Sequence, residues 1–372
     1  MTFPAALALL AAGCAPADRA LDEVAWPPAA QAPDAPGPFA VGFRTVTLAE
    51  YDPPLVMEVW YPIDADNAAS PADPYTSSFL EFPGSAHRDA EMAASAGVAP
   101  VAAFSHGYGG IRFQSLFLTE HLAAHGWVVV APDHAYNTML DLDGARSAEV
   151  AARRPGEIRR AVDALADGRV AGVYGDPSRY AVIGHSFGAW TALAVGGGRI
   201  DAAGFQAACA ETPRAACGFF EGQVIDPTAA ATEGAPDPRA VVTVALAPGG
   251  WYAFGPDGSG LADVRNPLVL GGTADADMPY EAEAVPTWEA LSAPKRLGGL
   301  VDSGHWSFTD LCLLAPVSDC AGVEGGFMDT ARARDLIRSR TLAHLRLELL
   351  GREADRAWLT GEPDLEWQDR AP

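Results

Sequence analysis

Three residues that lie far apart in the sequence have the side chains that nucleophilic catalysis requires. Ser186 lies in the stretch GHSFG, Asp275 follows the run PLVLGGTA, and His305 lies in the stretch SGHW. A serine hydroxyl becomes a strong nucleophile when a neutral histidine removes its proton, and that histidine needs a carboxylate to orient it. We therefore predict that Ser186 is a nucleophile, His305 its base and Asp275 the orienting acid. Asp277, two residues further on, is the alternative acid.

The residues around Ser186 indicate how the serine is presented. Apolar residues 180–184 predict a buried strand before it, and the small residues 189–195 predict a helix after it. Glycine has no Cβ, so Gly184 and Gly188 allow a sharp turn from strand to helix with the hydroxyl exposed at its tip. The order serine, acid, histidine along the chain also accompanies such a turn.

Two backbone N–H groups are expected to bind the oxyanion that forms during the reaction. One belongs to Phe187, which follows the nucleophile at the start of the helix. The other lies in the glycine-rich loop SHGYGG after a predicted strand, and Tyr108 is the candidate. His106 and His185 resemble catalytic bases by type, and we interpret them as structural partners of their turns.

Short apolar runs that alternate with helical runs must position these residues. Strands are predicted at 41–47, 55–61, 101–105, 127–131, 180–184, 240–247, 267–271 and 296–301, and helices at 114–125, 155–166, 189–195 and 328–350. This alternation predicts an α/β fold: a mostly parallel central sheet with helices on both faces, opened by an antiparallel pair. Pro155 is expected in the first turn of its helix.

The chain is expected to divide into four parts. Residues 1–14 predict a signal peptide, 15–38 a linker rich in proline and alanine, 39–350 the catalytic domain and 351–372 a C-terminal tail. Residues 199–238 contain several glycines and prolines and no regular period, so we predict an inserted, cap-like segment. This insertion either forms a lid over the site or is a surface excursion without a role in catalysis.

Charge and the N-terminus limit the partners and the location. The formal net charge of −23 argues against nucleic acid and against anionic lipid surfaces. The apolar run before Cys14 is too short to span a bilayer and resembles a signal peptide with a lipobox, in which Cys14 is lipidated. An ordinary cleaved signal or a buried N-terminal segment is the alternative. We predict an exported monomer that is periplasmic, anchored to the outer membrane through Cys14, or secreted.

The four remaining cysteines form two local pairs, and neither pair has the spacing of zinc ligands. In an oxidising compartment the simplest connectivity is Cys209–Cys217 and Cys312–Cys320. Two other connectivities are possible, and in the cytosol all four would be free thiols.

The chain resembles the α/β-hydrolases, and among them the platelet-activating-factor acetylhydrolases and the dienelactone-hydrolase-like bacterial esterases. The similar stretches are VGFRTVTL, PLVMEVWYP, AFSHGYGGIRFQSLFLTEHLAAHGWVVVAPDH, GHSFGA, GGTADADMPY and SGHWSFTDLC, which together span about residues 39–350. The resemblance implies that Ser186 is the nucleophile, His305 the base, and Tyr108 and Phe187 the oxyanion donors.

The sequence departs from these relatives at two positions. Pro248 stands where the vertebrate acetylhydrolases have their acid, so the acid moves to Asp275, as in bacterial esterases and polyester hydrolases. Ser186 stands where dienelactone hydrolases have a cysteine. A looser similarity to cutinase-like polyester hydrolases rests on the Gly-Tyr loop, on the spacing of Asp275 and Pro279, and on Trp251.

These features predict a serine carboxylic ester hydrolase that acts through an acyl-enzyme, with no metal or organic cofactor, on a small or polymeric ester. The polar composition of residues 199–238 favours short acyl groups. Trp190, Trp251 and Trp306 are candidates for the wall of an apolar substrate pocket, with core packing as the alternative. The alternative functions are a polyester hydrolase, a phospholipid acetylhydrolase, an amidase or peptidase, and an inactive hydrolase-fold binding lipoprotein.

Overall fold

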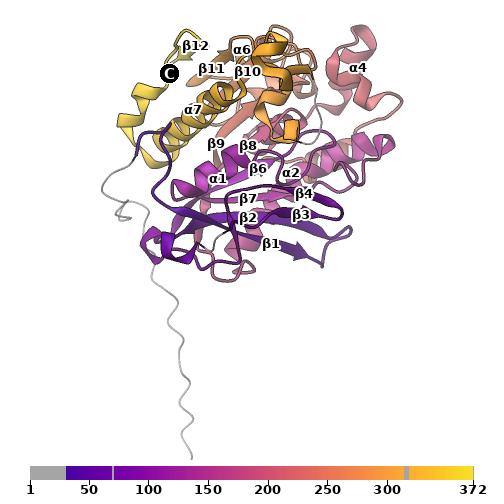
Figure 1. Ribbon diagram of the computed structural model, residues 1–372. Coiled ribbons are helices and arrows are strands. Elements are labelled where there is room, and N and C mark those ends of the chain that lie inside the picture. Colours follow the sequence, from indigo (N-terminus) through magenta and orange to yellow (C-terminus); the bar gives the residue numbers. More distant parts are fainter. Residues whose placement is uncertain (1–30, 69–70, 314–317, 372) are drawn as a thin grey trace, which may run out of the picture.

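The computed structural model describes residues 31–68, 71–313 and 318–371 (Figure 1). The predicted signal peptide, Cys14 and the first part of the predicted linker lie outside the described residues. Of the helices in the described part, none combines the length and the apolar character that crossing a membrane requires.

One large sheet forms the centre of the described chain. Its strands are β1 (Ala40–Leu48), β2 (Leu55–Ile63), β5 (His87–Arg88), β6 (Ala99–Ser105), β7 (Val128–Pro132), β8 (Gly175–His185), β9 (Ala240–Leu246), β10 (Pro267–Gly272), β11 (Lys295–Leu300) and β12 (Leu365–Arg370). They lie in the order β12-β11-β10-β9-β8-β6-β7-β2-β1-β5. A separate hairpin joins β3 (Tyr75–Ser77) and β4 (Leu80–Phe82).

The middle of the sheet is parallel and is flanked by antiparallel pairs, and the short edge strand β5 is parallel to β1. Neighbouring strands from β7 through β6, β8, β9 and β10 to β11 run in the same direction. β2 runs antiparallel to β1 and β7, and β12 runs antiparallel to β11. The carboxyl ends of the parallel strands therefore meet at one edge, where ligands of open α/β sheets bind.

Helices cover both faces of the sheet. They are α1 (Leu116–Ala124), α2 (Ser147–Ala166), α3 (Phe187–Gly196), α4 (Ala202–Glu211), α5 (Pro227–Thr232), α6 (Ala284–Ala290) and α7 (Thr330–Leu350). Leucines of α1 and α7 pack in one apolar cluster, whereas α2, α3 and α6 contribute to two other clusters. Every residue of β6 and β7 is buried. This explains why these strands read as continuous apolar runs without alternation.

The predicted elements are present, and some bounds differ. Helix α2 begins at Ser147, so Pro155 lies inside the helix and the prediction of a first-turn proline was wrong. The preceding residues SAEVAARR contain good helix formers, and they extend the helix toward the N-terminus.

The segments predicted as linker end and tail contact the domain. Within residues 31–38, the carbonyl groups of Pro33 and Ala35 accept hydrogen bonds at 2.9 and 3.0 Å from His121 of α1 and from His125, which directly follows that helix. At the other end, the predicted tail 351–372 supplies β12, which pairs with β11 along its whole length. The sheet thus extends beyond residue 350, where the sequence prediction ended the domain.

The insertion at residues 199–238 is helical and carries the first disulfide. It contains α4, the 3₁₀ turn Ala215–Phe220 and α5. The Cys209–Cys217 disulfide ties α4 to the 3₁₀ turn, and a Cys312–Cys320 disulfide closes a loop after His305. In Figure 1, α4 lies at the margin of the molecule, to one side of the sheet.

Candidate active site

Ser186 lies on the sharp turn between β8 and α3. Its backbone has φ 56° and ψ −118°, a left-handed conformation that a residue with a side chain rarely adopts. Its own N–H donates a hydrogen bond of 2.8 Å to the Leu246 carbonyl of the neighbouring strand β9. The turn is therefore tied to the sheet, and strain of this kind is typical of functional sites.

The two glycines of the GHSFG stretch are required because other backbone atoms lie too close for a side chain at either position. A Cβ on Gly184 would lie 1.9 Å from the Gly188 carbonyl oxygen, and a Cβ on Gly188 would lie 1.9 Å from the Ser105 carbonyl oxygen. Both φ angles lie outside the left-handed region, so backbone contact and not turn conformation excludes other residues here.

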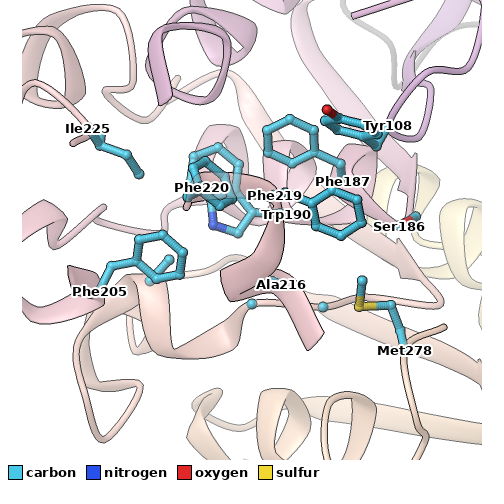
Figure 2. A pocket seen from close by; sticks show the side chains of 13 residues that line it. Tyr108, Ser186, Phe187, Trp190, Phe205, Ala216, Phe219, Phe220, Ile225 and Met278 are labelled. Atoms are coloured by element: carbon cyan, nitrogen blue, oxygen red, sulfur yellow. The ribbon is translucent and has the colours of Figure 1, made fainter. Parts of the chain in front are cut away.

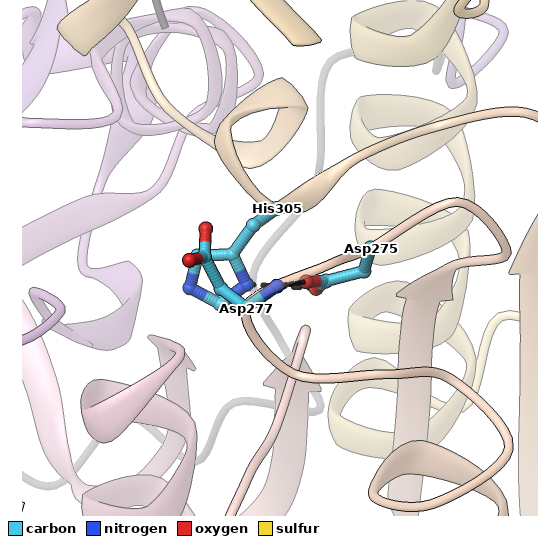
Figure 3. A group of neighbouring side chains, drawn as sticks. All are labelled: Asp275, Asp277 and His305. Carbon is cyan, nitrogen blue, oxygen red and sulfur yellow. Dashed lines mark hydrogen bonds and ion pairs between the residues drawn. The ribbon is translucent and has the colours of Figure 1, made fainter. Parts of the chain in front are cut away.

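His305 and Asp275 form a buried, hydrogen-bonded pair, as the sequence spacing predicted. His305 Nδ1–H donates to Asp275 Oδ2 at 2.7 Å, and Figure 3 shows the carboxylate pointing at the ring. Asp275 Oδ1 accepts from the N–H groups of Asp277 and Met278 at 2.9 and 2.7 Å. Three donors thus fix the carboxylate, and it holds the imidazole in the tautomer that leaves Nε2 free to accept a proton.

Asp277, the alternative acid, has a different partner. Its Oδ2 accepts from Trp306 Nε1 at 3.1 Å, and the residue is exposed. One atom each of Asp275, Asp277 and His305 lie within 4.8 Å of one another, as three metal ligands would (Figure 3). The Asp275 oxygens are already occupied by N–H donors, so hydrogen bonding accounts for the arrangement.

A chain of hydrogen bonds joins the nucleophile turn to the loops on either side of it. The Gly107 N–H donates to Gln114 Oε1 at 3.0 Å, and Gln114 Nε2 donates to His185 Nδ1 at 3.1 Å. His185 Nε2–H then donates to the His305 carbonyl at 3.1 Å. Burial holds the pKa of His185 well below its ordinary value of 6.5, so it stays neutral and keeps this tautomer.

The two predicted oxyanion donors lie beside Ser186. Phe187 is the first residue of α3, and the positive end of the helix dipole points to the same place. A Cβ on Gly107 would lie 3.5 Å from Ser186 Cβ, so the loop that carries Tyr108 passes directly over the serine. Within the described residues, the N–H groups of Tyr108 and Phe187 donate to no other group. Both are therefore available to a substrate oxygen.

A buried network underlies the Tyr108 loop. Ser105 Oγ lies 2.9 Å from His134 Nε2, and His134 Nδ1 lies 2.7 Å from Glu157 Oε2. These three hydrogen-bonded side chains have the geometry of a catalytic triad, yet Ser105 and His134 are completely buried. Arg154 donates to Ser105 Oγ and to the His106 carbonyl, and burial lowers its pKa to about 9. The cation therefore persists at neutral pH and holds the loop from below.

His106 belongs to the same network. Its Nδ1–H donates to the Gly107 carbonyl at 2.8 Å, and its Nε2 accepts from the His134 N–H at 3.0 Å. Burial lowers the pKa of His106 well below 6.5, so the ring remains neutral. Both histidines that resemble bases in the sequence, His106 and His185, thus hold backbone in place.

An apolar cavity opens beside Ser186 (Figure 2). Its lining residues are Tyr108, Ser186, Phe187, Trp190, Phe205, Ala216, Phe219, Phe220, Ile225, Gly249, Gly250, Ala253 and Met278. Of the three tryptophans that the sequence offered as pocket candidates, Trp190 lines this cavity, whereas Trp251 and Trp306 do not. Trp251 instead donates to the Ala282 carbonyl at 3.1 Å. Five lining residues come from the 199–238 insertion, which therefore forms part of the cavity wall.

Sequence reasoning missed several residues that hold the site. Asp319 Oδ2 accepts from the Trp306 N–H at 2.6 Å and lies next to Cys320, within the loop that the second disulfide closes. Gln114 and Arg154 were also not predicted to belong to the site. The only sequence feature that could have indicated their roles is a polar residue within an otherwise apolar stretch that is expected to be buried.

Comparisons with known proteins agree with this architecture. A family model described as chlorophyllase matches residues 91–213, which include Tyr108 and Ser186. A ferulic acid esterase from Streptomyces cinnamoneus, solved at 2.4 Å resolution, is similar in structure with a TM-score of 0.61. It shares 20% of its residues and covers 92% of this chain and 100% of its own. No curated protein sequence matches the chain.

The sheet order, the strand–serine–helix turn and this structural match show that the chain has the α/β-hydrolase fold. The fold class that it joins contains carboxylic ester hydrolases.

Proposed function

We propose that the protein is a serine carboxylic ester hydrolase in which Ser186, His305 and Asp275 form a catalytic triad. The observation that carries the proposal is the meeting of three features at one sheet edge. Ser186 stands on a strained turn, the rings of His185 and His305 lie 4.7 Å apart, and His305 is bonded to a fixed carboxylate. The free N–H groups of Tyr108 and Phe187 complete the set that acyl transfer needs.

The reaction follows from these groups in two steps. His305 Nε2 takes the hydroxyl proton of Ser186 as Oγ attacks the ester carbonyl, and the oxyanion is held by Tyr108 N–H and Phe187 N–H. The protonated His305 then gives its proton to the leaving alcohol, which departs from the acyl-enzyme. Water, deprotonated by His305, releases the acid and restores Ser186. Asp275 stabilises the charged imidazole in both steps.

The natural ester is a further part of the proposal. The similar solved structure acts on ferulic acid esters by its name, and the family model is that of chlorophyllases. Resemblance to platelet-activating-factor acetylhydrolases and polyester hydrolases adds acetylated phospholipids and polyesters as alternatives. The expected preference for short acyl groups rested on the polar composition of the insertion. The aromatic side chains that the insertion sends to the cavity argue for a larger acyl group.

We also propose that the protein is exported. Two disulfides in the described chain support an oxidising compartment. Lipidation of Cys14 is tested by the intact mass of protein purified from membranes. A diacylglyceryl group on a chain that begins at Cys14 supports anchoring, whereas a cleaved and unmodified N-terminus supports secretion.

The activity is tested with p-nitrophenyl esters from acetate to palmitate, on the wild-type protein and on Ser186→Ala. Hydrolysis by the wild type that the substitution abolishes supports the proposal. Folded protein that hydrolyses no ester, and that also fails to react with a serine-directed phosphonate, would instead favour the binding-protein alternative. Anilides of the same acids distinguish an esterase from an amidase.

A further inference from the structure

The cavity beside Ser186 contacts only part of the catalytic machinery. Ser186 and both residues that supply oxyanion donors, Tyr108 and Phe187, line it, whereas His305 is absent from the lining. In the proposed reaction His305 must reach the oxygen of the leaving alcohol. The alcohol therefore lies on the His305 side of the scissile bond. The acyl part must lie on the opposite side, in the cavity.

The walls of the cavity are largely aromatic. The Phe187 ring lies 5.6 Å from that of Trp190 and 6.0 Å from that of Phe220, which stands at 85° to it. Phe220 also meets Phe205 edge-on at 5.0 Å. Rings held at such angles present both faces and edges to a guest, and a flat aromatic guest can pair with each.

The far end of the cavity is closed. Figure 2 places Ser186 at one end of the group and Phe205 and Ile225 at the other. Phe205 is 3% exposed and Ile225 1% exposed, so both belong to the packed interior of the insertion. A long alkyl chain that extends past this end would have to displace these residues.

The insertion is held in position by covalent and polar contacts. The Cys209–Cys217 disulfide joins α4 to the turn that carries Phe219 and Phe220. Gln223, on the same segment, donates to the Gly144 carbonyl at 2.8 Å and accepts from the Ala148 N–H at 3.1 Å. The Phe219 ring packs on that of Tyr108 at 4.6 Å. The wall is thus tied to the main domain and shaped in advance of binding.

We propose that this cavity is an acyl subsite selective for a compact aromatic carboxylic acid, such as an arylpropanoic acid, over acetic and long alkanoic acids. The inference rests on the proposed esterase function and adds its substrate class. The residues that determine the selectivity are Phe187, Trp190, Phe205 and Phe220, two from α3 and two from the insertion.

The test compares three methyl esters with saturated acyl groups, so that the alcohol and the carbonyl reactivity are nearly constant. We expect kcat/KM for methyl 3-phenylpropanoate to exceed that for methyl acetate and methyl octanoate by about tenfold or more. Phe220→Ala should lower the ratio of phenylpropanoate to acetate kcat/KM by about tenfold. The control Phe79→Ala removes a phenylalanine that is 83% exposed and absent from the cavity lining, and should leave the ratio unchanged.

Two results would overturn the subsite. They are a wild-type preference for acetate or octanoate, and a ratio that Phe220→Ala leaves unaltered. Failure of the esterase proposal looks different, because then no ester is hydrolysed and no phosphonate reacts. In that case calorimetry of free 3-phenylpropanoate against octanoate still tests the cavity. Tighter binding of 3-phenylpropanoate, weakened by Phe220→Ala, supports it, and equal or absent binding refutes it.

Discussion

His185 Nε2 donates a hydrogen bond of 3.1 Å to the backbone carbonyl of His305. The residue before the proposed nucleophile thus holds the loop that carries the proposed base. Because Gln114 bonds both His185 and the Gly107 N–H, the same chain reaches the oxyanion loop. The buried side chains of Gln114 and His185 therefore fix the positions of three segments from different parts of the sequence. The proposed reaction depends on this relative positioning.

Gln114→Met should weaken catalysis more than binding. The substitution keeps the length of the side chain and removes both hydrogen bonds, so we expect kcat to fall about ten- to a hundredfold with KM nearly unchanged. Steady-state kinetics measure this split. Gln368→Met, at an exposed position of β12, is the matched control. An unchanged kcat in folded Gln114→Met would show that the hydrogen bonds of Gln114 are not needed to position the catalytic loops.

Asp275→Asn and Asp277→Asn should separate the two acid candidates. Asn at position 275 cannot stabilise the charged imidazole, and we expect kcat to fall by about 10³ to 10⁴. Asp277 bonds Trp306 at the surface, so Asp277→Asn should keep kcat within about threefold. Both variants should retain the wild-type circular dichroism spectrum. The larger loss in Asp277→Asn would reverse the assignment.

Ser105→Ala should cost stability and leave the nucleophile intact. Its hydroxyl donates to His134 Nε2, so removal leaves a buried acceptor without a partner, which costs about 1–3 kcal/mol of unfolding free energy. Urea unfolding measures this loss. A serine-directed phosphonate should still react with the variant, because Ser105 is completely buried. Loss of that reaction in folded Ser105→Ala would contradict the assignment of Ser186 as the nucleophile.

Glu283 should make the protein less stable as the pH rises from 4.5 to 7. Burial raises its pKa from 4.5 to about 7, and the Gly250 N–H at 2.8 Å offsets only part of that shift. A pKa that is higher in the folded state contributes stability that is full below pH 4.5 and is lost as the pH rises through 7. The shift corresponds to roughly 3 kcal/mol.

Glu283→Gln tests this dependence. The amide can still accept from Gly250 and carries no charge, so the variant should match the wild type at pH 4.5 and exceed its stability at pH 8. Urea unfolding at both values measures the difference, with the exposed Glu281→Gln as control. Parallel pH profiles for wild type and Glu283→Gln would refute the role of Glu283.

The sequence was informative where one local pattern has one structural meaning. Ser186 follows one apolar run and lies between two glycines, and Asp275 follows a later apolar run, PLVLGG. Both residues could therefore be placed at the ends of strands. His305 was identified because a base is needed at the end of a later strand. The direct bond from His305 to Asp275 was expected from this reasoning.

Tertiary contacts were harder to predict. Whether Trp251 or Phe220 faces the cavity depends on how the insertion folds back over α3, and its composition does not encode that packing. The tail gave no strong strand signal, because β12 is an edge strand with one buried residue, Leu365. The roles of Gln114 and Arg154 depend on partners far away in the sequence.

The most direct test of the central claim is the site of reaction with a fluorophosphonate, located by peptide mass spectrometry on the wild type and on Ser186→Ala. We expect one adduct per chain, on the peptide that contains Ser186, and no adduct in the variant. Folded wild-type protein that gains no adduct, or gains one on a different serine, would contradict the proposal that Ser186 is an activated nucleophile.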